Sequence, residues 1–232
     1  MNYLIINGQK SLSIQGLMIQ SLPPITKPMM RAQIDEVDGR DGDIVTPLGF
    51  QAYDRTVTIG LTKHFDIDEV IRFFNSYGEV TFSNEPYKIY KFDILAQIDF
   101  ERLLRFRTAT VTFHVQPFKH SIVEMPLEYS SNLDDIEILN NGNIYSKPKI
   151  EIFGQGDIDV TINDEMALAI ELGNEGTIII DAEKLEAYNF TGLKNRLVSG
   201  NYDNIIFEIG KNSLGFIGNV SRVVVSNYSR WI

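Results

Sequence analysis

The sequence contains no cysteine, only three histidines and one tryptophan. Without cysteine, disulfides and thiolate chemistry are excluded. No stretch reaches the ~18 consecutive apolar residues of a membrane span. The first residues form a short apolar run without a basic leader, which does not match a signal peptide. We therefore expect a chain made and folded in a cytoplasm, without a membrane anchor.

Positive charge is also scarce, with 21 Lys+Arg against 31 Asp+Glu and a net charge of −10. A general nucleic-acid binder carries a basic patch or stripe, so this class is disfavoured. Residues 1–118 hold 12 basic and 14 acidic residues (−2), whereas residues 119–232 hold 9 and 17 (−8). This asymmetry favours two domains, which a chain of 232 residues can accommodate.

Alternating apolar residues predict a mainly β fold with one α-helix in the N-terminal domain. The helix is expected to begin after Asp66 as N-cap and to end at Gly78, with Ile67, Val70 and Phe74 on its apolar face. Ile71 and Tyr77 complete that face. Strands are expected at residues 3–6, 11–14, 17–22, 29–37, 53–61, 79–82, 87–98 and 104–115, with Asn7-Gly8 as a turn and the last two strands forming a hairpin around residues 99–102.

After Pro117-Phe118, which is expected to end the pattern, strands become shorter and turns denser. Strands are expected at residues 150–153, 158–162, 166–172, 177–180, 205–209 and 220–228. Their spacing, without intervening helices, predicts a β-sandwich or jelly-roll. The boundary is placed between Pro117 and Lys147, giving domains at residues 1–130 and 131–232.

The stretch at residues 34–42 predicts a strand that runs into a tight, charged turn. Its candidate interface residues are Asp38, Gly39, Arg40, Asp41 and Gly42. The glycines can adopt positive φ at little steric cost. Residues 43–50 are interpreted as a long loop that reaches a neighbour, and Arg40 either binds an acid of that neighbour or pairs within its own loop.

Candidate catalytic and ligand-binding groups have simpler structural interpretations. His64, His114 and His120 lack metal-ligand spacing, and His114 fits a packed or edge strand position. Residues 154–156 follow a strand as a phosphate loop does, but a strand pattern continues after them, which favours a hairpin turn. We expect no metal and no cofactor.

Paired acids leave an enzyme hypothesis open. Asp157 with Asp159, or Asp164 with Glu165, could act as a glycosidase pair or bind calcium, although a solvated strand edge has the same pattern. A carbohydrate-binding module is the other alternative. Its stacking platform would come from the aromatic residues Tyr188, Phe190, Tyr202, Phe207, Phe216, Tyr228 and Trp231, which core packing explains equally well.

Several short motifs follow one another along the chain: Asn7-Gly8, residues 36–42, the single helix, residues 82–87, Pro117-Phe118, residues 140–143, 146–148, 150–156 and 178–181. Their order resembles the distal tail protein (Dit) family of long-tailed, non-contractile bacteriophages, or of a prophage. The resemblance covers nearly the whole chain. One departure is residues 200–205, which are longer than the compact turn expected there.

This resemblance implies an N-terminal domain that forms a hexameric ring, or belt, and a C-terminal galectin-like β-sandwich. The ring would join the tail tube to the tail-tip and receptor-binding proteins of the virion and leave a channel for DNA. DNA would pass without specific binding, because an acidic protein neutralises few phosphates. The resemblance implies a structural protein, not an enzyme.

Overall fold

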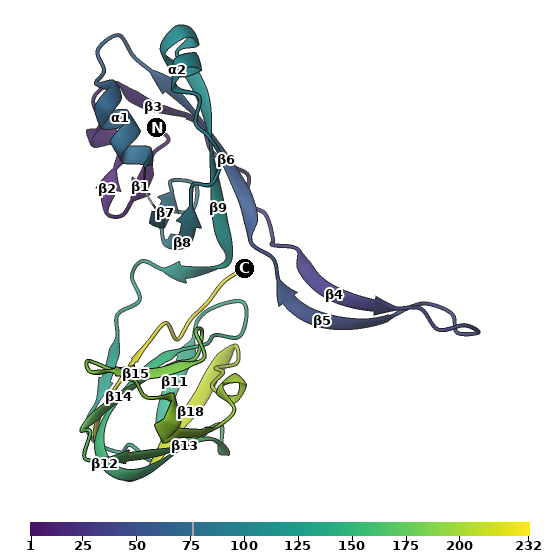
Figure 1. Ribbon diagram of the computed structural model, residues 1–232, viewed down its shortest axis with the longest axis vertical. Helices are drawn as coiled ribbons and strands as arrows, with labels where there is room; N and C mark the ends of the chain where they lie inside the picture. Colours follow the sequence, from purple (N-terminus) through teal and green to yellow (C-terminus); the bar gives the residue numbers. More distant parts are fainter. Residues whose placement is uncertain (76) are drawn as a thin grey trace. The chain divides into compact units, whose positions relative to one another are not determined.

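The computed structural model describes residues 1–75 and 77–232 (Figure 1). It is mainly β, as predicted. The chain divides into two compact units, Met1–Ile122 and Val123–Trp231, each with its own hydrophobic core. No helix among the described residues is long and apolar enough to cross a membrane.

The first unit is built on an antiparallel sheet with the strand order β2-β1-β7-β8-β9-β6-β3. Val57 on β6, with Val111 and Phe113 on β9, are fully buried and alternate with exposed or half-buried neighbours. This alternation is what a sheet with one buried face requires. The strands are β1 (Leu4–Ile6), β2 (Gln9–Lys10), β3 (Leu17–Ser21), β6 (Tyr53–Leu61), β7 (Tyr77–Phe82), β8 (Lys88–Asp93) and β9 (Thr108–Ser121).

The Asn7-Gly8 turn is confirmed, with φ of 47° and 82° at its two residues. The predicted return strand at residues 11–14 is wrong. The short strand β2 pairs with β1 after the turn, and Ser11–Ser13 then form a 3-10 turn. The buried Ser11 hydroxyl accepts a hydrogen bond from the Leu4 N–H at 3.0 Å. A side-chain hydrogen bond therefore takes the place of a backbone hydrogen bond between strands at Leu4.

Helix α1 (Ile67–Phe74) begins where predicted. The Asp66 side chain accepts hydrogen bonds from the N–H groups of Asp68 and Glu69. The predicted end at Gly78 is wrong, because Gly78 lies in β7 with φ of 129°. Tyr77 is 78% exposed and also belongs to β7, so it is not part of the helical face.

The predicted hairpin around residues 99–102 is a second helix, α2 (Phe100–Phe106). The Asp99 carboxylate accepts from the Arg102 N–H at 2.8 Å and caps it, while Arg107 closes it at φ of 59°. Leu103 is its buried anchor. Figure 1 shows α2 leading directly into β9.

The sheet does not end at Pro117. β9 continues to Ser121, and its pairing with β8 shifts, so that Phe92 lies opposite Val115 but Tyr90 lies opposite Lys119. The extra residues form a bulge that contains Pro117. A proline, which lacks an N–H donor, is tolerated at a bulge. The bulge thereby allows Lys119 to face Tyr90.

The second unit is organised around two long strands, β12 and β18. β12 pairs with β14 through its first half and with β13 through its second half, and β18 lies along both halves. Val123–Trp231 contain β10 (Leu127–Tyr129), β11 (Ile136–Asn140), β12 (Lys149–Ile162), β13 (Glu165–Gly173), β14 (Thr177–Asp181), β15 (Glu186–Asn189), β16 (Gly192–Leu193), β17 (Val198–Gly200) and β18 (Gly210–Ser226). Two predicted strands, 150–153 and 158–162, are therefore one.

Residues 154–156 are a bend inside β12, not the predicted hairpin turn. The register between β12 and β18 shifts at this point. An added Cβ at Gly154 would lie 2.5 Å from the Asn219 carbonyl oxygen, and one at Gly218 would lie 2.4 Å from that of Asp157. Strands that bend at such bulges turn a corner and contribute to two layers of a sandwich.

Two further predictions in the second unit are wrong. Residues 205–209 are not a strand; Phe207 forms an isolated bridge with Ser146. Strand β18 starts ten residues before the predicted 220. β10 also lies in the second unit, which begins at Val123, whereas the expected division followed residue 130. The longer segment at residues 200–205 contains a 3-10 turn, Tyr202–Asn204.

Candidate functional site

Between β3 and β6 the chain forms a ribbon, β4 (Met30–Asp35) and β5 (Ile44–Phe50), which we call the arm. Within the described residues these strands pair only with each other, and Figure 1 shows them standing apart from the sheet. The loop predicted for residues 43–50 is therefore a strand. Pro47 lies opposite Ala32 beside a bulge, and a ribbon with free edges tolerates a proline there.

The five candidate interface residues, 38–42, form the tip of the arm. Gly39 and Gly42 have φ of 81° and 79°, so both use the left-handed region that their position in the turn requires. The Arg40 N–H donates to the Val37 carbonyl oxygen at 3.1 Å. Among the described residues no ion pair is found for the Arg40 side chain, which is exposed together with the acids around it.

The arm has one apolar and one more polar face. Residues directly opposite each other in a ribbon lie on the same face. Gln33 opposite Thr46 belongs to the polar face, where the Gln33 side chain donates to the Asp35 carboxylate. The apolar face is formed by three facing pairs: Ile34 with Val45, Ala32 with Pro47, and Met30 with Phe50.

Among the residues that the structure describes, cover on this apolar face is found at its root. The Phe50 ring contacts the Phe118 ring edge-on at 5.5 Å between centroids. Farther out, Ile34 is 60% exposed and Val45 is 52% exposed. A contiguous apolar surface with nothing packed on it is typical of a protein contact site.

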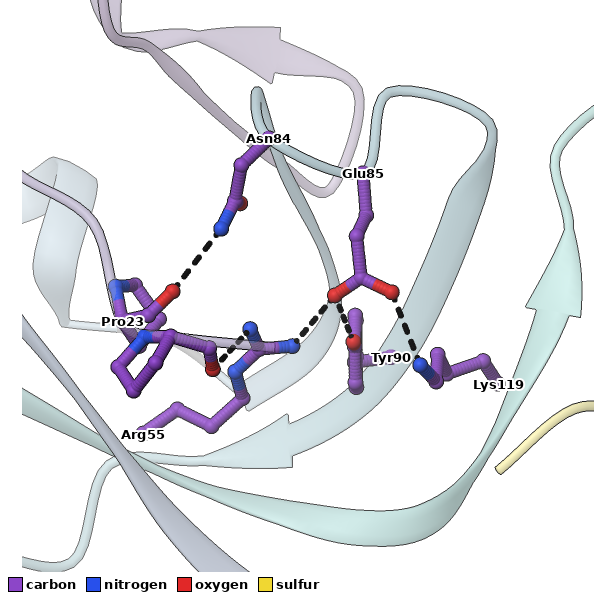
Figure 2. A network of polar contacts seen from close by, with 7 residues as sticks. Pro23, Arg55, Asn84, Glu85, Tyr90 and Lys119 are labelled. Atoms are coloured by element: carbon purple, nitrogen blue, oxygen red, sulfur yellow. Dashed lines mark hydrogen bonds and ion pairs between the residues drawn. The ribbon is translucent and has the colours of Figure 1, made fainter. Parts of the chain in front are cut away.

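A buried ionic cluster anchors the root of the arm to the sheet (Figure 2). The Glu85 carboxylate accepts from the Arg55 guanidinium at 3.0 Å and from the Lys119 ammonium at 2.8 Å, and it also accepts from the Tyr90 hydroxyl. Arg55 and Lys119 are only 2% and 4% exposed. Three strands and the β7–β8 turn therefore meet at one carboxylate.

The cluster also holds the segment that enters the arm. The Arg55 guanidinium donates to the Pro24 carbonyl oxygen at 3.1 Å, and the Asn84 amide donates to that of Pro23 at 2.9 Å. The same guanidinium lies 4.5 Å from the ring centroids of Phe82 and Tyr90, which adds cation–π attraction. Figure 2 shows Asn84 and Arg55 reaching this entry segment.

The electrostatics of the cluster favour an ionised Glu85. Burial alone raises the pKa of this carboxyl, but hydrogen bonds from Lys119, Tyr90 and Arg55 outweigh burial and hold the pKa below its ordinary value. Burial, and then the hydrogen bond to Glu85, raise the pKa of the Tyr90 phenol far above its usual range. The phenol therefore stays protonated and donates.

No local sequence pattern indicates this cluster directly. Glu85 belongs to the motif at residues 82–87, and Arg55 and Lys119 lie 30 and 34 residues away from it in the sequence. Two basic residues on neighbouring strands, opposite apolar positions, are a weak indication of a buried charge pair. The β8–β9 bulge that positions Lys119 was not predictable from alternation.

The candidate catalytic groups do not converge. His114 Nδ1 lies 2.8 Å from the Asp54 carboxylate across the neighbouring strands β9 and β6. His114 is half-buried on β9, an interior strand of the sheet, so of the two expected positions the packed one is confirmed and the edge one is not. Asp157 and Asp159 lie along β12 opposite Glu171 and Ala169. No group of three or more histidine, aspartate and glutamate side chains with metal-binding geometry occurs in the part of the chain that the structure describes.

The aromatic residues considered for a sugar-stacking platform differ in how far they are buried. Phe207 and Phe216 are buried in the core of the second unit. Tyr202 and Tyr228 pack against that core and are half-buried. Phe190 is 89% exposed at the turn between β15 and β16.

No family model matches the sequence, and no curated protein matches it. Among solved structures, the SPP1 Dit protein (gp 19.1), a paradigm of the hub adsorption apparatus in phages that infect Gram-positive bacteria, aligns over 100% of both chains with a TM-score of 0.67 and 13% identity. A chain of the phage P2 baseplate in its activated conformation with Ca aligns over 97% of both chains with a TM-score of 0.48 and 11% identity. The alignment with the SPP1 Dit protein shows that the chain has the same fold, as its resemblance implied.

Proposed function

We propose that this chain is a structural hub of a phage tail tip and assembles into a hexameric ring through the arm. The ring joins the tail tube to the tail-tip and receptor-binding proteins and leaves a channel for DNA, with the second unit as a galectin-like sandwich. The fold shared with the SPP1 Dit protein supports this role. The observation that carries the assembly is the exposed apolar face of the arm.

The exposed apolar face of the arm favours self-association. A ribbon that buries almost nothing within its own chain gains little hydrophobic stabilisation there. Packing Ile34 and Val45 against another protein would remove both from water. The buried cluster at the root fixes where the arm leaves the sheet, so its outer part is presented to a neighbour in a defined direction.

The test compares the two faces of the arm. Ile34→Ser with Val45→Ser removes the apolar pair, whereas Gln33→Ser with Thr46→Ser changes a facing pair on the other side of the same ribbon. We expect the first variant to lose the hexamer in native mass spectrometry and the second to retain it. Equal assembly of both variants would reject the role of the apolar face.

Arg40 is tested separately at the tip. If its guanidinium binds an acid of the adjacent subunit, Arg40→Ala should weaken the ring, because an exposed or partly exposed ion pair contributes up to ~1 kcal/mol at each of the repeated contacts. A hexamer of undiminished abundance in native mass spectrometry would limit the contact to the apolar face.

A further inference from the structure

We infer that the acceptor for the arm is the surface of α2 on a second copy of this chain. This inference rests on the proposed function, because it names the partner site of the same contact. Two observations carry it: complementary chemistry of the arm and α2, and their positions at opposite ends of one strand pair.

The acceptor surface is basic and apolar. Residues 100–107 contain three arginines and one glutamate, a net charge of +2. Arg102 is exposed, and Arg105 makes only a long, exposed contact of 3.7 Å with Glu101. Leu104 and Phe106 are 43% and 68% exposed. Arginine beside exposed apolar side chains is typical of protein contact surfaces.

The surface continues into a hollow next to α2. A depression of about 730 Å³ is lined mostly by apolar side chains, among them Leu95, Ile98 and Phe100, and also by the polar residues Asp93 and Asn75. Leu95 is 74% exposed at its edge. An apolar side chain of a neighbour fits the chemistry of this hollow.

The arm has the opposite charge and a matching apolar face. Residues 29–50 contain five acids and two arginines, a net charge of −3. Four of the acids, at positions 36, 38, 41 and 43, gather around the tip. Such complementarity guides association and fixes its register, while the apolar pairs Ile34–Val45 and Ala32–Pro47 provide the buried area.

The topology separates donor and acceptor within one chain. The arm leads into the start of β6, where Tyr53 pairs with Val115, whereas α2 precedes β9 at the other end, where Gly60 pairs with Thr108. Seven strand residues at ~3.3 Å each place these ends about 23 Å apart. Each copy therefore offers a donor at one end and an acceptor at the other, which is the requirement for head-to-tail assembly.

Charge reversal with rescue tests the pairing. Asp38→Lys with Asp41→Lys reverses the donor, and Arg102→Glu with Arg105→Glu reverses the acceptor. We expect each to raise the concentration of half-assembly by about tenfold or more, and the fourfold variant to recover most of that loss. Lys184→Glu with Arg196→Glu, two exposed cations of the second unit, is the matched control.

Engineered cysteines give an independent readout, since the chain has none of its own. Asp41→Cys combined with Arg105→Cys should form disulfide-linked species larger than dimers, because every copy carries both halves of the contact. Asp41→Cys combined with Lys211→Cys, on the second unit, is the control. Cross-linking no stronger than in this control, together with absence of charge rescue, would overturn the inference.

The role of the arm in assembly and the role of α2 as its acceptor can be tested separately. If the Ile34→Ser, Val45→Ser variant loses assembly but cross-linking to α2 is absent, the arm acts on another surface and only this inference falls. If that variant assembles like the wild type, the proposed role of the arm itself fails.

Discussion

Replacing Glu85 by glutamine tests the buried ionic cluster at the root of the arm. The substitution keeps the shape of the side chain and one acceptor oxygen but removes its charge. Arg55 and Lys119, almost fully buried, then lose their counter-ion. Removing one partner of a buried ion pair costs ~3–5 kcal/mol, because the remaining charge is left uncompensated.

The retained acceptor places the expected loss at the lower end, about 3 kcal/mol of the free energy of unfolding of the first unit. For a unit of this size about 4 °C correspond to each kcal/mol, so its melting temperature should fall on the order of 10 °C. Glu79→Gln, an exposed position on β7, is the matched control and should change stability by less than ~0.5 kcal/mol.

Hydrogen exchange read by mass spectrometry can assign the loss to one unit. Peptides from β6 and β9 should exchange faster in Glu85→Gln, whereas peptides from β12 and β18 should be unchanged, because the two units have separate cores. A first unit with wild-type protection, or equal loss in both units, would refute the reasoning.

Three further predictions follow from local features. Folding lowers the pKa of Glu85, so its ionised carboxylate stabilises the folded state above the unfolded pKa near 4.5, and this stabilisation is lost as pH falls through the folded pKa. The stability of Glu85→Gln, followed by circular dichroism, should therefore depend less steeply on pH below about 4.5 than that of the wild type. Gly218→Ala should lower the free energy of unfolding of the second unit by about 2–3 kcal/mol in urea titration, because φ is 130° at this position and the new Cβ would collide with the Asp157 carbonyl oxygen. Gly156→Ala, where a Cβ meets open space, should cost about 1 kcal/mol. Equal costs for the two variants would show that close packing of the strands at the bend of β12 does not require Gly218. Asp66→Ala should cost about 1 kcal/mol through loss of the α1 N-cap, and no change in the thermal midpoint would contradict it.

The parts of the fold that were predictable depend on local rules. Asp66 caps α1 because its carboxylate reaches the first free N–H groups, and Asn7-Gly8 turns because both residues tolerate positive φ. The β character followed from alternation. Helix α2 was not predicted, because Leu104 and Phe106 are two residues apart, which is the spacing of apolar residues in a strand. Asp99, however, is a residue type that favours a helix N-cap.

The functional surface was only half predictable. The glycines of the tip identified the turn, but Pro47 and Gly49 favoured a loop where the chain forms β5, because a free ribbon tolerates both. The apolar face depends on the register that places Ile34 opposite Val45, and register is set across a turn of eight residues. The cluster of Glu85 depends on contacts between residues that are 30 and 34 positions apart in the sequence, which local patterns do not encode.

The proposed function depends on self-association of the chain through the arm. The most direct measurement is the mass of the assembled particle in solution, over a range of concentrations, for the intact chain and for a variant in which residues 29–50 are replaced by a short glycine-serine turn. We expect six times the mass of one chain for the intact chain and a folded single chain for the variant without the arm. An intact chain that remains single at the highest concentration, or an assembly that survives removal of the arm, would contradict it.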